Sequence, residues 1–437
     1  MRDTSNTSVK EFLKLGLKSQ KERNFHQAIK HYESVIEIDP SVVFAHYNLG
    51  LINEKLGNTV KAKKNYLLAI KTEPLFVYSY TNLGIIYQKE GEKEKAIEYF
   101  QRVIDIDSKN FNGYNNLGLV YASQGNYHAA INNYFKSLKI EKNNLIAIKS
   151  IIFLLTYFIP DKSHPLIRAN NDLRLLQKKF SLSDLLKINN ISSILNNSQK
   201  ILDKLSIDLE NLNFFETQAY RRNPIDLNCE YHHKVFNKFK IIPKFCFNCF
   251  KIQIEPKNVI DLIRLFFIFD SLNLNKNNQR KCMVEFRNDV PGSYKGMIYC
   301  SSFAEAKKIL MELKPILNNY LESKSDIKRG CSEFYNLFPN YRITKPSEKD
   351  FMKYDEKWEE IEKNLDIKTN FNTIKLNHSI PGLSISDFLI IIHWLNYARI
   401  IGDTTYKKIN FDFFRSKFID QQLLNQVEFR KKEFNNT

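Results

Sequence analysis

The sequence predicts an α+β protein, in which an all-α block of repeats precedes a small sheet domain and a helical C-terminal segment. Two observations support this prediction. A period of 34 residues runs without a gap from residue 9 to residue 144, and the hydrophobic patterns between residues 250 and 340 follow the order β-α-β-β-α-β. We therefore expect five segments, which are residues 9–144, 145–215, 216–249, 250–340 and 341–437.

The repeat block holds four repeats with the same residue types at fixed positions. Their bounds are Val9–Val42, Val43–Phe76, Val77–Asn110 and Phe111–Asn144. Glycine stands at the eighth position, alanine at the twentieth, and tyrosine or phenylalanine at the twenty-fourth, as in Gly50, Ala62 and Tyr66. Small residues let two helices approach closely, and the aromatic ring fills the space that remains. The pattern predicts four similar helix pairs.

These repeats resemble the tetratricopeptide repeat (TPR) family. The resemblance covers residues 9–144 and implies a right-handed superhelix, whose first helices line a concave groove for a peptide or partner protein. The second, fifth and sixth positions would face this groove, and asparagine amides there can pair with an extended backbone. The candidates are Tyr47, Asn48, Tyr78, Thr81, Asn82, Asn112, Asn115 and Asn116. Leu13, Leu17 and Asn112 replace the basic residues with which some members grip chaperone C-termini, so we do not expect that ligand.

Residues 145–215 predict a helical extension of the repeats. Leu145–Phe158 keeps a helical pattern but loses the repeat residues, as a terminal capping helix does. Ser181-x-x-Asp184 is similar to a capping box that opens another helix, and Gln199–Leu212 predicts a further one.

Alternating apolar residues and capping signals predict a sheet domain over residues 250–340. The expected elements are strands at Phe250–Ile254, Cys282–Phe286, Met297–Cys300 and Asp326–Phe334, and helices at Val259–Leu272 and Ser302–Leu321. This is the ferredoxin-like arrangement, a four-stranded antiparallel sheet with two helices on one face. In the last segment we expect helices over Glu348–Asn364 and from Ser384 to Ile401.

The third expected strand is similar to a signature of the RNA recognition motif family. It reads Lys295-Gly296-Met297-Ile298-Tyr299-Cys300, with a basic residue, a glycine and then stacking residues at alternate positions. Met297 and Tyr299 would face outward. Met297 and Ser302 stand where that family has aromatic residues, so we rank nucleic acid below a protein as the partner.

Two pairs of residues in the segment 216–249 predict a metal site. Cys229-x-x-His232 and Cys246-x-x-Cys249 share one spacing, and 13 residues separate them. The pattern suits one structural zinc ion held by Cys229, His232, Cys246 and Cys249, with His233 as the alternative to His232. Such a site requires a tight turn at Phe247-Asn248, because both sulfur atoms must lie on one side. Buried thiols and a redox pair are the other two interpretations.

Composition and charge narrow the function. The 437 residues carry a formal net charge of +17, which suits an acidic partner but also follows from the Lys, Asn and Ile bias of an AT-rich genome. No secretory signal or membrane span is evident, and six cysteines without a signal indicate a reducing compartment, so we expect a cytoplasmic protein. Common nucleotide-binding, hydrolase and metalloprotease motifs are absent. Cys331 lies in the basic stretch Lys328-Arg-Gly-Cys, where a thiolate is favoured, although packing is the commoner role of a lone cysteine.

Together these observations predict a non-catalytic scaffold or adaptor that binds a partner protein or peptide in the TPR groove. The alternative is an enzyme or RNA-binding module within residues 216–340, with the repeat block selecting its client.

Overall fold

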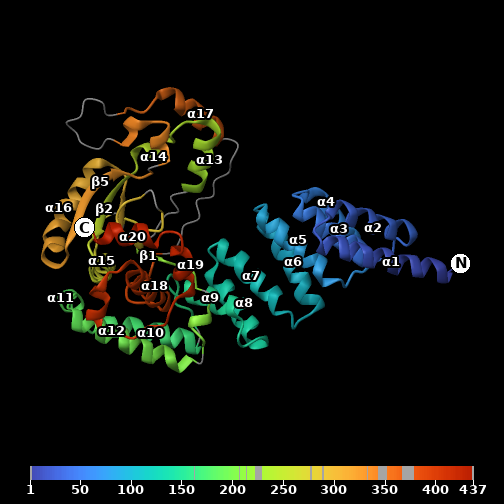
Figure 1. Ribbon diagram of the computed structural model, residues 1–437, viewed down its shortest axis with the longest axis horizontal. Coiled ribbons are helices and arrows are strands. Elements are labelled where there is room, and N and C mark those ends of the chain that lie inside the picture. The colour runs from blue at the N-terminus through green and yellow to red at the C-terminus, as the bar shows by residue number, and fades with distance from the viewer. Residues whose placement is uncertain are drawn as a thin grey trace. The chain divides into compact units, whose positions relative to one another are not determined.

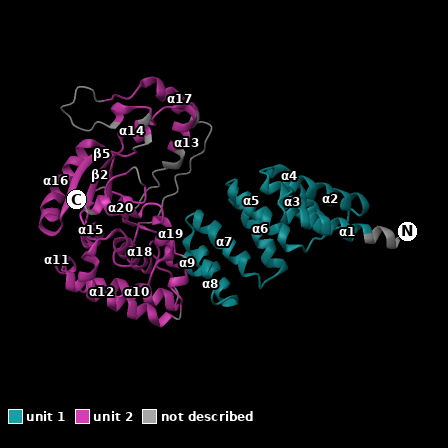
Figure 2. Cartoon of the chain, in the orientation of Figure 1, with its two compact units in different colours: residues 1–150 teal, residues 151–437 magenta. Residues whose placement is uncertain are grey.

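The computed structural model describes residues 2–161, 163–205, 207–212, 214–221, 229–275, 278–287, 290–331, 333–342, 352–366 and 378–435. Its contacts divide into two compact units, residues 1–150 and residues 151–437 (Figure 2). The segments expected after residue 150 therefore share one unit. No helix among the described residues is long and apolar enough to cross a lipid bilayer.

The first unit is a succession of helix pairs, one for each 34-residue repeat (Figure 1). The helices are α1 (Arg2–Lys21), α2 (Phe25–Ile38), α3 (Val43–Lys55), α4 (Thr59–Thr72), α5 (Val77–Lys89), α6 (Lys93–Ile106), α7 (Phe111–Ser123) and α8 (Tyr127–Ile140). Each of the three later pairs turns at a glycine with positive φ, such as Gly57 at 77°. The first pair turns at Arg23, which adopts the same left-handed backbone with φ of 59° although it has a side chain. The left-handed conformation of Arg23 therefore has a steric cost that glycine would avoid.

The glycine at the eighth position and the aromatic residue at the twenty-fourth lie against each other in every pair. A β-carbon added to Gly50 would lie 2.4 Å from Cε1 of Tyr66, and one added to Gly84 would lie 2.5 Å from Cε1 of Phe100. Tyr66 and Phe100 are both fully buried. The repeat pattern thus encodes a close approach of the two helices of each pair.

A helical extension follows. Its helices are α9 (Leu145–Leu154), α10 (Pro165–Lys178), α11 (Leu182–Leu185) and α12 (Ile188–Leu202), with 3-10 turns at Asp203–Leu205 and Glu210–Leu212. The expected helix over Gln199–Leu212 is different in the structure, because α12 begins much earlier and ends at Leu202. Its apolar face, which includes Ile191, Ile194 and Leu202, is buried and sets these bounds. The hydroxyl of Ser181 caps Asp184 as expected, but the helix it opens has only four residues.

A five-stranded antiparallel sheet forms the centre of the second unit. Its strands are β1 (Gln218–Arg221), β2 (Phe250–Pro256), β3 (Arg280–Val284), β4 (Tyr294–Cys300) and β5 (Ser323–Arg329), in the spatial order β1-β3-β4-β2-β5. Two helices, α15 (Val259–Ser271) and α16 (Phe303–Tyr320), pack on the same face. Gly296 of β4 lies under Leu265 of α15, and the ring of Phe250, which shares its face with Gly296, contacts Phe303 of α16. The sequence predicted four strands and missed β1.

The second unit has further helices among its described residues. They are α13 (Cys229–Phe239), α14 (Lys244–Asn248), α17 (Glu356–Asp366), α18 (Ile385–Ile401), α19 (Lys417–Leu423) and α20 (Val427–Asn435), with 3-10 turns at Glu333–Asn336, Pro339–Arg342 and Thr404–Ile409. Helix α18 is buried along most of its length and begins at a complete capping box between Ser384 and Asp387. The first part of the helix expected over 348–364 lies outside the described residues.

Candidate functional site

An aromatic patch lies on α3 and α5, the first helices of repeats two and three, and on the residue that caps the start of α5. It consists of Phe44, Tyr47, Phe76 and Tyr78, whose rings touch with centroid separations of 5.2 to 6.0 Å. Tyr78 is 63% exposed and Phe44 is 55% exposed, whereas Phe76 is buried beneath them. Exposed aromatic rings that rest on a rigid base are common anchors in protein interfaces. This aromatic patch is therefore a surface suited to an apolar side chain of a partner.

A polar cluster lies beside the patch on α3, α4 and α5, where the rings of Tyr47 and Tyr66 are 5.9 Å apart. The hydroxyl of Tyr66 donates to Oε2 of Glu54 at 3.3 Å, and Nζ of Lys89 lies 3.0 Å from Oε1 of the same carboxylate. Burial raises the pKa of Tyr66, and the nearby Glu54 charge raises it further, so its hydroxyl stays a donor. The amide nitrogen of Asn82 is buried beside the Tyr47 and Tyr66 hydroxyls and makes no hydrogen bond of good geometry within the described chain.

The predicted groove residues separate into three groups. Tyr47 and Tyr78 come together in the aromatic patch, and Asn112 is exposed. Asn48 donates to the backbone oxygen of Phe44 at 2.8 Å, and Thr81 donates to that of Val77 at 3.1 Å, so both donors are used within their own helices. Asn82, Asn115 and Asn116 are half-buried or buried.

Asn115 is 3% exposed, and neither of its amide atoms has a hydrogen-bond partner among the described residues. Phe44 was missed from the sequence, although it occupies the same second position as Tyr78 and Asn112. The repeat register alone would have found it.

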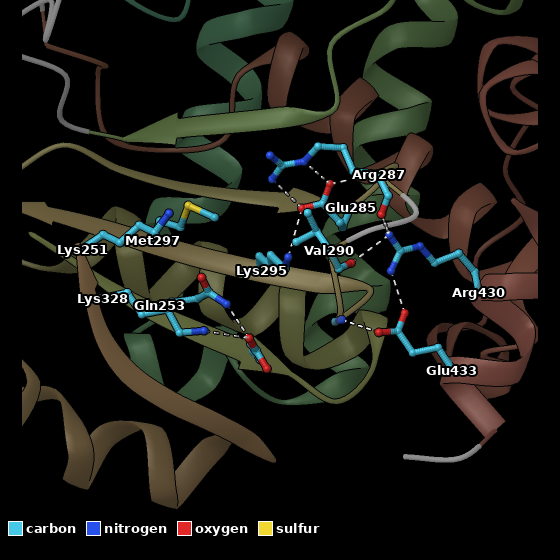
Figure 3. A network of polar contacts seen from close by, with 12 residues as sticks. Lys251, Gln253, Glu285, Arg287, Val290, Lys295, Met297, Lys328, Arg430 and Glu433 are labelled. Carbon is cyan, nitrogen blue, oxygen red and sulfur yellow. Dashed lines mark hydrogen bonds and ion pairs between the residues drawn. The ribbon is translucent and has the colours of Figure 1, made fainter. Parts of the chain in front are cut away.

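A second candidate surface is the polar face of the sheet, which we define as the face opposite α15 and α16. Figure 3 shows its central contacts. Lys295 of β4 and Glu285, just after β3, form a buried ion pair at 3.0 Å, and Arg287 makes two hydrogen bonds to the same carboxylate at 3.0 Å. Gln253 donates to Glu255, and Nζ of Lys328 lies 3.8 Å from that carboxylate (Figure 3).

The ionisation of the buried pair follows from its contacts. Burial opposes the charge on Glu285, but the hydrogen bonds from Arg287 and the charge of Lys295 outweigh it and lower the pKa of Glu285 to about 2. Burial lowers the pKa of Lys295, while Glu285 opposes this shift. The pair therefore fixes the end of the β3–β4 hairpin by a charged contact.

Helix α20 holds this hairpin from outside the sheet. Arg430 donates to the backbone oxygens of Arg287 and Val290 and pairs with Glu433 at 2.6 Å, and Glu433 accepts from the backbone nitrogen of Gly292 at 2.5 Å (Figure 3). The expectation that Met297 and Tyr299 share the face away from the helices agrees with the strand register, in which they oppose Gln253 and Lys251. Met297 is only 4% exposed, so it offers little surface for stacking on a base.

The cysteine segment forms a helical turn rather than a straight strand. Cys246 lies in α14, and the backbone nitrogen of Cys249 donates to the backbone oxygen of Cys246 at 3.2 Å. The chain therefore turns at Phe247-Asn248, as a metal site there would require. His232 stacks on Phe245 with a centroid separation of 5.2 Å, and the side chain of Cys229 lies outside the described residues. As they stand, no three Cys, His, Asp or Glu side chains of the described chain form a group that could hold a metal.

Comparison with known families identifies the repeats. Models described as "Tetratricopeptide repeat" match residues 77–110, 111–144 and 45–74, and one described as "TPR repeat" matches residues 24–57. Residues 24–144 are thus a TPR segment, as the sequence predicted. These matches do not extend into the second unit. Comparison with curated proteins gave no match.

Solved structures similar to this chain include several whose titles name MamA and one whose title names pilF. A structure titled "Crystal structure of MamA protein" is 23% identical with a TM-score of 0.33, over 47% of this chain and 98% of that one. "Functional Characterization of Pseudomonas Aeruginosa pilF" is 18% identical with a TM-score of 0.35, over 48% and 94%. "MamA 41-end from Desulfovibrio magneticus RS-1" is 19% identical with a TM-score of 0.29, over 31% and 77%.

Proposed function

We propose that this protein is an adaptor whose TPR segment binds an extended segment of a partner protein. The observation that carries the proposal is the aromatic patch beside a polar cluster on successive first helices. Phe44 and Tyr78 would take an apolar side chain of the partner, and Asn82, Asn112 and Asn116 would pair with its backbone. The exposed lysines of these helices, which include Lys55 and Lys89, favour an acidic segment.

Photo-crosslinking and capture test this proposal. A photoreactive phenylalanine at Tyr78 should cross-link to a defined peptide of the partner, which mass spectrometry identifies. Tyr78→Ala, and Asn82→Ala combined with Asn116→Ala, should then weaken its capture by roughly tenfold or more, because interface anchors are worth about 2 kcal/mol. Val60→Ala is the matched control, since Val60 is an exposed apolar residue on the second helix of its repeat. If none of these variants changed the capture of the partner, the binding site would lie outside the aromatic patch and the groove residues.

We infer that β2, α15, β3, β4, α16 and β5 form a ferredoxin-like module to which β1 is added. The strand order β5-β2-β4-β3 and the two helices on one face support this assignment. A cytoplasmic location stays an expectation from the cysteine content. Loss of the β2–β4 pairing in an experimental structure would contradict the module.

Single-stranded RNA is the second candidate ligand, on the polar face of the sheet. Two contacts favour RNA binding over catalysis on this face. Lys251 pairs with Tyr299 across strands, and Nζ of Lys281 lies 5.5 Å from the centroid of the Tyr220 ring. Basic groups beside aromatic rings suit a single-stranded nucleic acid.

We expect weak binding that salt abolishes, because the buried Met297 leaves Tyr299 as the main stacking residue on β4. Fluorescence anisotropy with a labelled oligouridine measures it. A salt-resistant complex that Tyr299→Ala removes would make RNA binding the principal function instead.

A further inference from the structure

A third cysteine lies beside the Cys246–Cys249 turn, although it is far away in the sequence. Cys331 follows Gly330 at the end of β5. The backbone nitrogen of Gly330 donates to the backbone oxygen of Cys249 at 2.8 Å. A β-carbon added to Gly330 would lie 2.6 Å from the sulfur of Cys249, so that sulfur occupies the space that the glycine leaves open. The end of β5 is therefore pressed directly against Cys249.

Two of the three cysteines, Cys246 and Cys331, lie in the same cluster as one buried tyrosine. The hydroxyl of Tyr341 donates to the backbone oxygen of Cys246 at 2.9 Å. Cys331 packs against the hydrophobic cluster that contains both Cys246 and Tyr341. Three thiol groups from two distant segments thus share one small region.

We propose that Cys331 joins Cys246 and Cys249 as three thiolate ligands of one structural zinc ion, and that α13 supplies the fourth ligand. Helix α13 contains His232, whose ring stacks on that of Phe245, the residue before Cys246. The first residue of α13 is Cys229, which is the other candidate for the fourth ligand. Three thiolates with one imidazole, or four thiolates, are both common closed zinc sites. The thiol groups are not grouped for a metal as they stand, so zinc must draw them together by rotation of their side chains.

Two basic side chains would compensate for the thiolate charge. A zinc ion with three thiolates and a neutral imidazole carries a net charge of −1, and one with four thiolates carries −2. The guanidinium of Arg329 is buried over the ring of Phe247, 4.2 Å from its centroid, and donates to the backbone oxygen of Phe247. Nζ of Lys251 donates to the backbone oxygen of Gly330 at 2.9 Å. Both cations therefore adjoin the backbone that carries the three cysteines, and nearby positive charge favours thiolates.

Metal content and affinity of the full-length protein test this proposal. When the protein is produced with zinc in the medium, inductively coupled plasma mass spectrometry should find about one zinc ion per chain, because the proposal contains one closed site. Cys331→Ser should lower zinc affinity in a chelator competition by at least roughly 100-fold, because even residues that only orient a ligand are worth about 10- to 100-fold. Cys300→Ser is the matched control, since Cys300 is a free cysteine of β4 whose sulfur donates to the backbone oxygen of Ile298 in the same strand. It should keep the zinc.

Two further measurements separate a ligand from a packing residue. Cobalt(II) in place of zinc should give sulfur-to-metal charge-transfer absorption, whose intensity reports the number of thiolate ligands. In Cys331→His this intensity should fall by the share of one thiolate, while the metal stays bound. One of the two variants Cys229→Ser and His232→Ala should also lose zinc, and the variant that does so identifies the fourth ligand. A wild-type protein without zinc, a Cys331→Ser variant that binds zinc like Cys300→Ser, or a disulfide at Cys331 would each overturn the proposal. So would full zinc affinity in both α13 variants.

Discussion

Each repeat of the first unit depends on the absence of one side chain. Gly84 faces the ring of Phe100, which is fully buried. Protein interiors are packed as densely as organic crystals, so an extra methyl group must displace its neighbours. The glycine at the eighth position is therefore a packing requirement in the interior of a helix, where glycine otherwise costs about 1 kcal/mol relative to alanine.

We expect Gly84→Ala to destabilise the first unit by roughly 1 to 3 kcal/mol. The added methyl group overpacks the contact with Phe100, and this outweighs the better helix propensity of alanine. Urea denaturation followed by far-ultraviolet circular dichroism measures the change. Combining the substitution with Phe100→Leu should restore part of the loss, because leucine leaves room for the methyl group. A single variant as stable as the wild type would show that the helices can separate without cost.

Among the elements, α18 shows how a helix with polar residues can be buried. Arg221 of β1 pairs with Asp387 in the first turn of α18 at 2.8 Å and with Asp270 of α15 at 2.8 Å. The three side chains are at most 5% exposed, so the guanidinium of Arg221 lies between two buried carboxylates. Further along α18, His393 lies between the rings of Phe214 and Phe418.

We expect the second unit to lose stability as the pH falls from about 6.5 towards 4, because of His393. Nδ1 of His393 lies 2.7 Å from the backbone oxygen of Glu216 and therefore carries the proton of a neutral ring. Burial lowers the pKa of His393 to about 4, although the hydrogen bond to Glu216 opposes the shift. The unfolded chain, with a pKa near 6.5, binds the proton first, so acid favours unfolding over this range.

The loss should amount to roughly 2 to 3 kcal/mol between pH 7 and pH 4.5. Urea denaturation at the two pH values measures it. His393→Gln keeps a donor for the Glu216 oxygen and should remove most of the difference. An equal pH dependence in the variant would assign the effect to other groups.

The sequence predicted local elements well and long-range contacts poorly, for a physical reason. Capping residues such as Ser302 and Ser384 act within their own turn, so they indicated the starts of α16 and α18 correctly. Strand β1 has only four residues, and its pairing with β3 is visible only in three dimensions. The approach of Cys331 to Cys249 depends on the β2–β5 register and could not be read from spacing. Of the groove candidates, the exposure of Tyr78 followed from its repeat position, whereas the hydrogen bond of Asn48 within its own helix did not.

At the scale of the whole molecule, the chain consists of two compact units, and tryptophan fluorescence can follow the unfolding of only one of them. Both tryptophans, Trp358 and Trp394, belong to residues 151–437. Trp394 is fully buried between α18 and the core of the second unit. Intrinsic tryptophan fluorescence therefore reports on the second unit alone, whereas circular dichroism detects the helices of both units.

We expect the two units to unfold separately. Gly84→Ala should shift the circular dichroism transition of the first unit to lower urea, and leave the tryptophan fluorescence midpoint unchanged, because its clash with Phe100 lies wholly within residues 1–150. Conversely, acid should move the fluorescence midpoint through His393 and spare the helical transition of the repeats. Urea titrations followed by both signals on the same samples make the comparison. If Gly84→Ala moved both midpoints by the same amount, the units would unfold as one cooperative body, and the TPR segment would depend on the second unit for its stability.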